Sequence, residues 1–540
     1  MESKSEWWKG TVIYQIYPWS FSDSNGDGIG DLPGIIGKLD YLSELGVETI
    51  WFSPFFKSPG MDFGYDISDY LEIDPRFGTM KDCDKLIREI HKRKMKVVLD
   101  MVMNHTSKEH PWFKESSSSK TNPKRDFYIW KPAKDGKPPN NWKSMVGSSG
   151  WNLDSNTGEY YYSNFLSFQP DLNYRNPEVK KAMFKVLEFW LKKGVDGFRL
   201  DIFNSIFKDK NFLDNPASTR FFPTPDNHDE AFFQKKIHNL NLPESFALAK
   251  EVRNLLSKFK QKPFVIGEVS GNDSILKSFL GERADGLNLV FQFELIHFEF
   301  YANFFRTLLE KNEREFSEPY QPVYVFGNHD QRRYIDRIKG DAKKAKILSC
   351  FQLTARGVPV IYYGEEIGRP EGDISIQAGK DPIAKMNSLV PKFLSDFLGI
   401  YINRDNCRLP MLWDEGKNAS FSVGESWLGV GKYNKEQTVA YQKSDEDSLW
   451  KHYQKLIQIR KKEKALQFGK LDLLPEESKS LLAYVRKWKE EEITIYLNFG
   501  KESCFLKDLG KHSVLYQFGN VDLLRNELGS YSGLLLKRVK

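Results

Sequence analysis

The sequence predicts an α/β protein: a (β/α)8 TIM barrel with an inserted subdomain after its third strand and a C-terminal antiparallel β-sandwich domain. Short apolar runs alternate with amphipathic helical stretches, which is typical of parallel strands joined by helices. The connection after the third run is unusually long, and connections of that length usually carry structure of their own. Beyond residue 463 the helical stretches give way to short strand-like runs. The alternation alone leaves a doubly wound sheet as the alternative.

The predicted barrel strands are eight short apolar runs bounded by polar or glycine-containing segments. They cover residues 12–17, 49–52, 96–103, 197–201, 264–268, 287–293, 323–326 and 358–362. Amphipathic stretches at 83–94 and 177–193 are predicted helices between them. We therefore assign residues 1–104 and 177–463 to the barrel.

Two further domains are predicted outside the barrel. Residues 105–176 contain a serine run, several prolines and three consecutive tyrosines, and they form the predicted inserted subdomain. Residues 464–540 form the predicted C-terminal all-β domain, which follows a helical stretch ending near residue 462. Its candidate strands cover 481–485, 493–497 and 533–536.

Composition and charge limit the class of partner. Of the 540 residues, 40% are hydrophobic and 28% are charged, as in ordinary soluble globular proteins. The net charge of +6 is small and both signs are interleaved, which argues against a nucleic-acid partner. No apolar run has the length of a secretion signal or a membrane span. The four cysteines lie far apart in the sequence, which suits free thiols in a reducing compartment; they are Cys83, Cys350, Cys407 and Cys504. We expect a cytoplasmic monomer or weak homo-oligomer with no membrane partner.

The most informative run is Gly-Phe-Arg-Leu-Asp at 197–201, which reads as a short buried strand ending in an acid. Side chains two residues apart on a strand point the same way, so Arg199 is predicted to lie beside Asp201. A fixed cation keeps a neighbouring carboxylate ionised, as a nucleophile or an electrostatic stabiliser requires. For such a pair in isolation, a buried ion pair of purely structural value is the alternative.

Acids also mark other strand ends. Glu268 ends the fifth predicted strand, Asp330 follows the seventh, and Asp100 and His105 lie on and just after the third. In a barrel these strand ends converge on one face, where active sites are built. Burying unneeded charges together is expensive, so this gathering indicates a catalytic site. Acids without a Cys/His metal cluster suit glycoside hydrolysis, in which one carboxylate attacks and another acid protonates the leaving oxygen.

Taken in order, the motifs at 100–105, 197–201, 267–268 and 328–330 resemble those of glycoside hydrolase family 13, the α-amylase family. The resemblance covers nearly the full length of the chain. It implies a retaining mechanism with a covalent β-glucosyl-aspartate, whose two reacting carboxyls are roughly 5–5.5 Å apart.

The resemblance also implies roles for individual residues. Asp201 corresponds to the nucleophile, Glu268 to the general acid/base, and Asp330 to the residue that binds ring hydroxyls and stabilises the transition state. Three further residues are implied to line the glycosyl subsite: His105, Arg199 and His329.

Other motifs resemble the oligo-1,6-glucosidase and α-glucosidase branch of that family. Gln-Pro-Asp-Leu-Asn at 169–173 is similar to the marker of the branch. The run at 62–70 resembles the clamp of exo-acting α-glucosidases at the non-reducing end, in which Asp62 would grip the terminal hydroxyls and Tyr65 would stack on the ring. Phe63 stands where asparagine is commoner in the family.

Two arginine-containing runs extend this likeness. In 331–337, Arg333 and Arg337 look like pocket-side arginines of the branch, and Arg337 is the better match to a ligand of the terminal glucose. The run at 404–413 also matches the branch. Ile202 follows the residue that corresponds to the nucleophile. In the resembled branch, a β-branched aliphatic residue at that place goes with activity on α-1,6 bonds. Activity on α-1,4 bonds or on sucrose is the alternative.

A second constellation suggests a structural cation. Asp23, Asn25, Asp27 and Asp31 alternate with serine and glycine, as oxygen ligands do in the first half of an EF-hand loop, although no glutamate stands at the twelfth position. On spacing alone, a solvated acidic turn is the alternative. The first βα loop of the resembled branch carries a calcium site, where the carbonyl corresponding to Ile29 completes the coordination. We expect structural Ca²⁺, with Mg²⁺ as a second choice.

These observations leave three functional hypotheses. The first is an exo-acting α-glucosidase that hydrolyses short oligosaccharides or disaccharides from the non-reducing end, of the oligo-1,6-glucosidase, maltase or sucrase type. The second is a sucrose or maltose isomerase or a transglucosylase, of the isomaltulose synthase or trehalose synthase type. The third is a non-catalytic partner like the amylase-like ectodomains of transporter heavy chains, which the three acids and the absence of a long apolar run disfavour.

Overall fold

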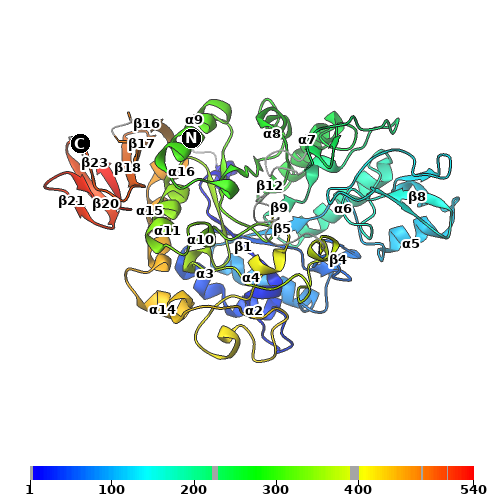
Figure 1. Cartoon of the computed structure of the whole chain (residues 1–540), viewed down its shortest axis with the longest axis horizontal. Helices are drawn as coiled ribbons and strands as arrows, with labels where there is room; N and C mark the ends of the chain where they lie inside the picture. Colours follow the sequence, from blue (N-terminus) through cyan, green and yellow to red (C-terminus); the bar gives the residue numbers. More distant parts are fainter. Residues whose placement is uncertain (1–3, 222–228, 389–400, 476–477, 508, 540) are drawn as a thin grey trace.

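The computed structural model describes residues 4–221, 229–388, 401–475, 478–507 and 509–539. Its centre is an eight-stranded parallel sheet with the strand order β13-β12-β9-β5-β2-β1-β15-β14. An isolated parallel bridge between Gln292 and Tyr324 links the ends of the sheet and brings it round into a nearly closed barrel. Figure 1 shows the barrel in the middle, the C-terminal strands on the left and the inserted subdomain around β8 on the right.

All eight predicted strands are confirmed, most of them trimmed at the ends. They are β1 (Ile13–Ile16), β2 (Thr49–Phe52), β5 (Lys96–Met101), β9 (Gly197–Leu200), β12 (Phe264–Gly267), β13 (Leu289–Val290), β14 (Val323–Val325) and β15 (Val358–Tyr362). The sixth is much shorter than predicted, and side chains add to the backbone bonds at both of its ends. Asn288 Oδ1 accepts the Val265 N–H at 3.0 Å, and Gln292 Oε1 accepts the Val323 N–H at 3.1 Å.

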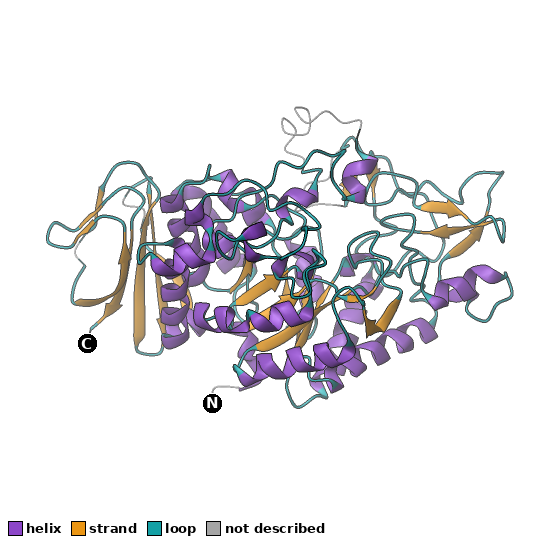
Figure 2. Cartoon of the chain, turned by 90° about the horizontal axis from the view of Figure 1, so that it is seen from below, coloured by secondary structure: helices purple, strands orange, loops and turns teal. Residues whose placement is uncertain are grey.

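Helices cover the outside of the barrel, as the purple ribbons around the orange strands show in Figure 2. The main ones are α3 (Leu39–Leu45), α4 (Met80–Lys92), α6 (Pro177–Lys192), α7 (Pro243–Ser257), α8 (Asp273–Leu280), α9 (Ala302–Glu315), α11 (Ala342–Thr354) and α15 (Leu449–Lys462). Thr79 and Asp82 form a capping box at the start of α4, and the Asn176 side chain caps α6 just ahead of Pro177. These caps explain why both predicted helices begin close to their expected positions.

Inside the barrel the side chains change from apolar to polar along the strands. Ile13 and Val98 belong to an apolar cluster that fills the lower part of the barrel. Two residues further on, and therefore on the same face, lie the buried polar residues Gln15 and Asp100. The pairing of β5 with β9 sets Arg199 directly beside Asp100. The barrel thus presents a buried polar layer at the carboxyl ends of its strands.

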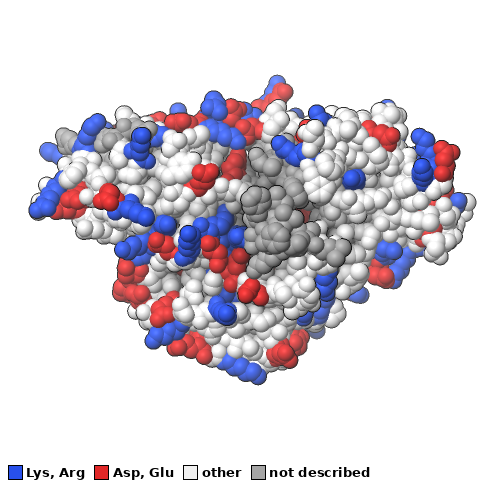
Figure 3. All heavy atoms as spheres, viewed as in Figure 1, with Lys and Arg blue, Asp and Glu red and all other residues white. Residues whose placement is uncertain are grey.

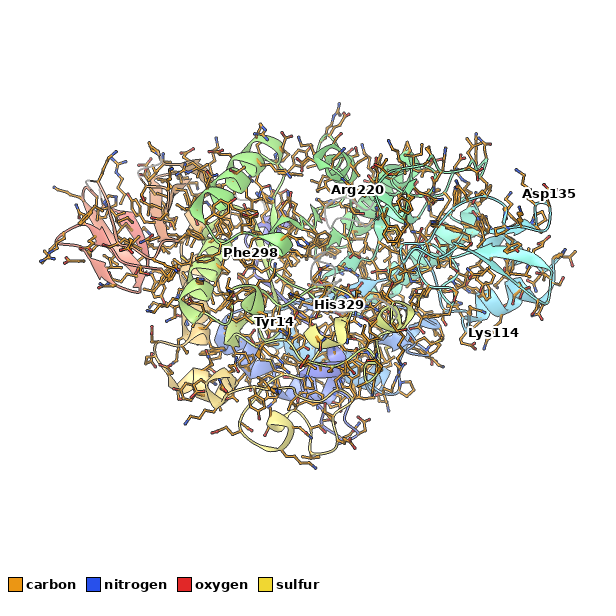
Figure 4. All side chains as sticks on the ribbon, in the orientation of Figure 1. Tyr14, Lys114, Asp135, Arg220, Phe298 and His329 are labelled. Atoms are coloured by element: carbon orange, nitrogen blue, oxygen red, sulfur yellow. The ribbon has the colours of Figure 1, made fainter. Side chains whose placement is uncertain are left out.

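The predicted inserted subdomain contains helix α5 (Pro111–Ser118) and a small antiparallel sheet with the order β6-β8-β7. Its strands are β6 (Trp130–Pro132), β7 (Trp151–Leu153) and β8 (Glu159–Tyr162). Its own apolar cluster consists of Ile129, Trp142, Trp151 and Tyr162. Figure 4 labels Lys114 and Asp135 at its outer end, far from His329 in the barrel.

A buried lysine joins this subdomain to the barrel. Lys208, in the connection after β9, forms an ion pair with Asp171, and both side chains are 2% exposed or less. Lys208 Nζ also donates to Asn104 Oδ1 at 2.8 Å. Asp171 Oδ1 in turn accepts the Asn164 N–H at 2.8 Å, and the backbone of Asp171 bridges that of His105. The subdomain is therefore fixed to the strand end that carries His105.

The predicted C-terminal all-β domain begins with a short helix, α16 (Lys464–Phe468), and its regular structure beyond that helix is β. A five-stranded antiparallel sheet has the order β16-β17-β18-β23-β20, from β16 (Lys470–Leu473), β17 (Leu481–Trp488), β18 (Glu491–Asn498), β20 (His512–Phe518) and β23 (Gly533–Arg538). A second small sheet has the order β19-β22-β21, from β19 (Cys504–Phe505), β21 (Val521–Asp522) and β22 (Glu527–Leu528). Both sheets contribute to one apolar cluster that includes Leu481, Leu506, Leu528 and Leu534.

Two surface properties bear on the class of partner. On the face shown in Figure 3, lysine and arginine are intermixed with aspartate and glutamate, without a broad region of one sign. Among the described residues, no helix is both long enough and apolar enough to span a lipid bilayer.

Candidate active site

A cavity of about 250 Å³ opens at the carboxyl ends of the barrel strands. Most of the residues predicted to bind or react lie on its wall: Asp62, Tyr65, His105, Asp201, Glu268 and Asp330. They come from connections that are far apart in sequence and that the barrel brings to one face. His329, labelled near the centre of Figure 4, lies behind this wall and contacts two of these residues.

Arg199 holds three carboxylates at the centre of the site. Its Nη1 lies 2.8 Å from Asp100 Oδ1 and 2.8 Å from Asp201 Oδ1, and its Nη2 lies 2.6 Å from Glu268 Oε2. The guanidinium is 2% exposed, so these contacts are almost fully shielded from water. The planar fork of arginine can bind several carboxylate oxygens at fixed angles, which orients the three acids relative to one another.

The charges in this cluster do not balance, because one cation faces three acids. Burial raises the pKa of Asp201 well above its usual value, the Arg199 guanidinium opposes that rise, and the neighbouring Glu268 and Asp100 carboxylates add to it. Burial likewise raises the pKa of Asp100 to about 6, again against the effect of Arg199. Interacting carboxyls of this kind titrate as a group. The cluster is therefore suited to exchanging a proton during a reaction.

His329 is a neutral, hydrogen-bonded ring between two of the strand ends. Burial lowers the pKa of His329 to about 3, although Asp330 raises it. Its Nδ1 lies 2.8 Å from Gln15 Nε2, and its Nε2 lies 2.6 Å from the Tyr65 hydroxyl. The rings of Tyr65 and His329 stack with centroids 5.3 Å apart. Tyr65 also donates to Asp100 Oδ2 at 3.0 Å, which links the histidine to the Arg199 cluster.

Asp330 is held as an anion by two arginines. Its Oδ1 lies 3.1 Å from Arg404 Nη1 and 2.7 Å from Arg408 Nη2. Burial alone would raise the pKa of Asp330, but the positive charges of Arg404, Arg408 and Arg199 outweigh burial and lower it below the usual range. Asp330 therefore differs from Asp201: its partners neutralise it well enough to keep it ionised even in acid.

Arg404 had no predicted role, yet it is a main binding residue of the site. Its Nη2 lies 2.9 Å from Asp62 Oδ1 and 2.7 Å from Asp381 Oδ1, so the one guanidinium joins Asp62, Asp330 and Asp381. Gln169, from the motif at 169–173, donates to the other oxygen of Asp62 at 3.0 Å. Arg404 was already part of the recognised run at 404–413, but no pattern in that run indicates which arginine reaches the cavity.

The structure does not place Arg337, the predicted ligand of the terminal sugar, on the cavity wall. Arg337 ends the short helix α10 (Tyr334–Arg337) and does not line the cavity. Its guanidinium donates to the backbone carbonyls of Leu295, at 3.1 Å, and of Ile296 and Phe326, and it lies over the ring of Phe298. Three carbonyl acceptors thus hold the guanidinium away from the pocket. Arg404 occupies the place beside Asp62 instead.

His105 lies where it was predicted, on the cavity wall. Its Nε2 lies 3.2 Å from the backbone oxygen of Tyr65, and burial lowers the pKa of His105 to about 3. A neutral imidazole at this place can exchange hydrogen bonds with a hydroxyl without adding charge to the acidic cluster.

The rest of the wall is largely apolar and comes from several connections. The inserted subdomain supplies Met145 and Phe165, the connection after β9 supplies Ile202, and the segment after β13 supplies Phe293. Ile202 has left-handed backbone angles (φ 31°, ψ 46°), which a β-branched residue rarely adopts. Its N–H lies 3.2 Å from Glu268 Oε2, so this unusual conformation directs an amide toward one of the acids.

The predicted cation loop is ordered by its own hydrogen bonds. Asp23 Oδ1 accepts the Asn25 N–H at 2.9 Å, and Asp27 Oδ1 accepts the Ile29 N–H at 2.8 Å. Asp31 caps the helix α2 (Leu32–Gly37). In the described part of the chain, no three His, Cys, Asp or Glu side chains gather closely enough to hold a metal ion. The oxygen-rich loop suits a hard cation chemically, but its carboxylates face loop amides here, and a metal stays a prediction.

Comparisons with known proteins agree with this geometry. A family model described as the α-amylase catalytic domain matches residues 15–469. The oligo-1,6-glucosidase of Bacillus cereus is 38% identical over 532 residues, which is 93% of each chain. The solved structure of an α-glucosyl transfer enzyme, XgtA, has a TM-score of 0.89 at 34% identity and covers 98% of this chain and 99% of its own.

A further solved structure is an isomaltulose synthase mutant from Erwinia rhapontici NX5 in complex with sucrose. It has a TM-score of 0.86 at 33% identity and covers 98% of this chain and 99% of its own. With the family model spanning most of the barrel and relatives aligned along nearly the whole sequence, the chain belongs to the α-amylase family, glycoside hydrolase family 13, and is a glycoside hydrolase.

Proposed function

We propose that this enzyme is a retaining, exo-acting α-glucosidase that releases glucose from the non-reducing end of short α-glucosides. The observation that carries the proposal is the Arg199 guanidinium, which binds Asp201 and Glu268 through its two terminal nitrogens. Two carboxyls held on one guanidinium favour the short separation of retaining enzymes, about 5–5.5 Å, over the wider spacing that an inverting enzyme needs for its water.

The reaction follows from the place of each acid. Asp201 attacks the anomeric carbon while Glu268 donates a proton to the glycosidic oxygen, and the aglycone leaves. The Glu268 carboxylate then takes a proton from water, the water oxygen bonds to the anomeric carbon, and Asp201 is released. Asp330 stays ionised throughout and stabilises the positive charge that develops on the sugar ring.

The preference for the end of a sugar chain is supported by the far side of the cavity. Asp62 is only 2% exposed and is bound to Arg404, which also binds Asp330 and Asp381. Carboxylate and guanidinium groups together offer acceptors and donors for the hydroxyls of a terminal glucose. We infer that these residues bind the terminal glucose, so that a second sugar extends away from them.

Isomerisation or transglucosylation is the second candidate, and the apolar wall favours it. Met145, Phe165, Ile202 and Phe293 line the same cavity as the acids. Such a wall limits water near the glucosyl intermediate and gives an acceptor sugar an apolar surface to pack on. The two candidates share the same first step and differ in whether water or a sugar completes the second.

Product identification on maltose, isomaltose, sucrose and trehalose tests the proposal. We expect free glucose as the major product from at least one of them, with retained α configuration by NMR. Asp201→Asn and Glu268→Gln should each lower kcat by about 10³-fold or more, since each removes a covalent or proton-transfer step. Circular dichroism should show both variants folded. An isomeric disaccharide as the major product would favour the second candidate, and normal turnover by folded Asp201→Asn would rule out both.

The corrected role of Arg404 can be tested against Arg337. Arg404→Lys keeps the charge but loses the fork that joins Asp62, Asp330 and Asp381, so kcat/KM should fall about 10–100-fold. Arg337→Lys should leave kcat/KM within about threefold but lower the melting temperature, because buried carbonyls lose their donors. Steady-state kinetics on the two variants gives kcat/KM, and thermal unfolding gives the melting temperature. An equal loss of kcat/KM in folded Arg337→Lys would restore the original assignment.

The raised pKa of Asp201 predicts where activity is lost in acid. The nucleophile must be ionised, and its ionised form disappears as the pH falls through its raised pKa. The acid limb of kcat/KM should therefore lie above the ordinary aspartate value of about 3.9. Asp100→Asn removes one of the charges that raise this pKa and frees Arg199 for Asp201, so it should move the acid limb to lower pH. A limb that stays fixed or moves upward contradicts this account.

We further propose that Ca²⁺ binds the loop at 23–31, on the strength of its alternating oxygen carriers. Calcium at a concentration near 100 times its dissociation constant should add about 2.7 kcal/mol of stability, which raises the melting temperature relative to protein in EGTA. Asp27→Ala should abolish the shift, and Asp472→Ala, an exposed residue of the C-terminal sheet, should retain it. Mg²⁺ serves as the competing ion. Identical melting in EGTA and in millimolar Ca²⁺ would show that the loop needs no cation.

We also propose that the enzyme works in the cytoplasm as a monomer or weak homo-oligomer. All four cysteines are buried free thiols, which suits a reducing compartment.

A further inference from the structure

Lys236 is a buried lysine on the wall of the active-site cavity that the catalytic mechanism does not use. It lies in the connection between β9 and α7, and only 1% of the residue is exposed. Its Nζ donates to the backbone oxygen of Ser144 at 2.9 Å and approaches Met145 Sδ at 3.3 Å. An ammonium group has three N–H bonds, so these two contacts leave donor capacity beside the cavity.

The partners of Lys236 are neutral. In the described part of the chain, no carboxylate lies within ion-pair distance of its Nζ, and the acid that acts on it most strongly from further away is Asp229. Lys143, a second cation, acts on it unfavourably. Burial lowers the pKa of Lys236 to about 7. Burying an ammonium without a counter-charge is costly, and an incoming anion would offset much of that cost.

The position of Lys236 separates it from the glucose-binding end. That end is formed by Asp62, Asp330 and Arg404, whose acids and guanidinium bind one another. Lys236 instead contacts the inserted subdomain through Ser144 and Met145, and none of the catalytic acids contributes to its charge environment. Lys236 is therefore a cation that lines the cavity beside the inserted subdomain, outside the carboxylate network.

We propose that Lys236 binds an anionic substituent, a phosphate or a carboxylate, on the aglycone sugar. The inference rests on the proposed α-glucosidase function and narrows it to a substrate class: α-glucosides whose leaving sugar carries a negative charge. The glucosyl unit stays neutral, because acids surround it. Lys236 takes no part in bond breaking and acts only on the choice of aglycone.

Paired substrates test this proposal. Maltose and isomaltose would each be compared with the same disaccharide phosphorylated at O6 of the reducing-end sugar. The wild-type enzyme should show kcat/KM about tenfold or more higher for the phosphorylated member, as expected for one charged hydrogen bond. Lys236→Met should reduce that ratio to about one, and Lys236→Arg should retain much of it. Lys210→Met is the matched control, because Lys210 belongs to the same connection but is exposed and does not line the cavity, and its ratio should equal that of wild type.

Direct binding provides a second measurement that needs no turnover. Isothermal titration should show glucose 6-phosphate and gluconate binding the wild-type protein more tightly than glucose, and the two anions distinguish phosphate from carboxylate recognition. The proposal would be overturned if the wild-type ratio of kcat/KM for phosphorylated over neutral substrate were one or below, or if that ratio were unchanged in Lys236→Met. Lys236 would then serve only to bind the inserted subdomain. Tight binding of the anions without hydrolysis of any α-glucoside would instead contradict the proposed function and leave the lysine site standing. If Lys236→Met does not fold, the wild-type titration and kinetic ratio decide alone.

Discussion

The active site depends on one buried guanidinium. Arg199 binds Asp100, Asp201 and Glu268 at once, and it is the only group that compensates their charge at that point of the described structure. Without it, three carboxylates would share a nearly dry space, and Coulomb repulsion would force protons onto them or push them apart. With it, one acid can stay ionised while another keeps a proton. The geometry and the proton chemistry of the site therefore have the same origin.

Barrel architecture explains why this cluster was predictable from the sequence. Asp100, Arg199, Asp201 and Glu268 all lie on or next to regular strands, where side chains alternate and strand ends converge. Two simple periodicities therefore place them with little ambiguity. The eight strands themselves were predictable for the same reason, and β13 was overestimated most, since only Leu289–Val290 of the predicted run is regular strand.

Side chains in the long connections could not be placed from the sequence in this way. Arg404 and Arg337 both stand in recognisable runs, yet one guanidinium reaches Asp62 while the other is taken up by backbone carbonyls. That choice depends on the paths of the connections after β14 and β15, which follow no regular period. Lys236 escaped notice for the same reason, since its burial comes from the docking of two connections against each other. Whether the loop at 23–31 binds a cation likewise cannot be read from residue spacing.

The conformation of Ile202 has a consequence for how specificity can evolve in this enzyme. A β-branched residue held at φ 31° stores an energy of about 1–3 kcal/mol, and the same peptide directs its N–H toward Glu268. Replacing the side chain therefore changes two things together: the shape of the cavity and the ease with which the backbone keeps its amide near the acid. A smaller or more permissive residue would relax the backbone while it widened the cavity. Bond preference and catalytic rate are consequently expected to change together at this position, so neither could be tuned there by selection without affecting the other.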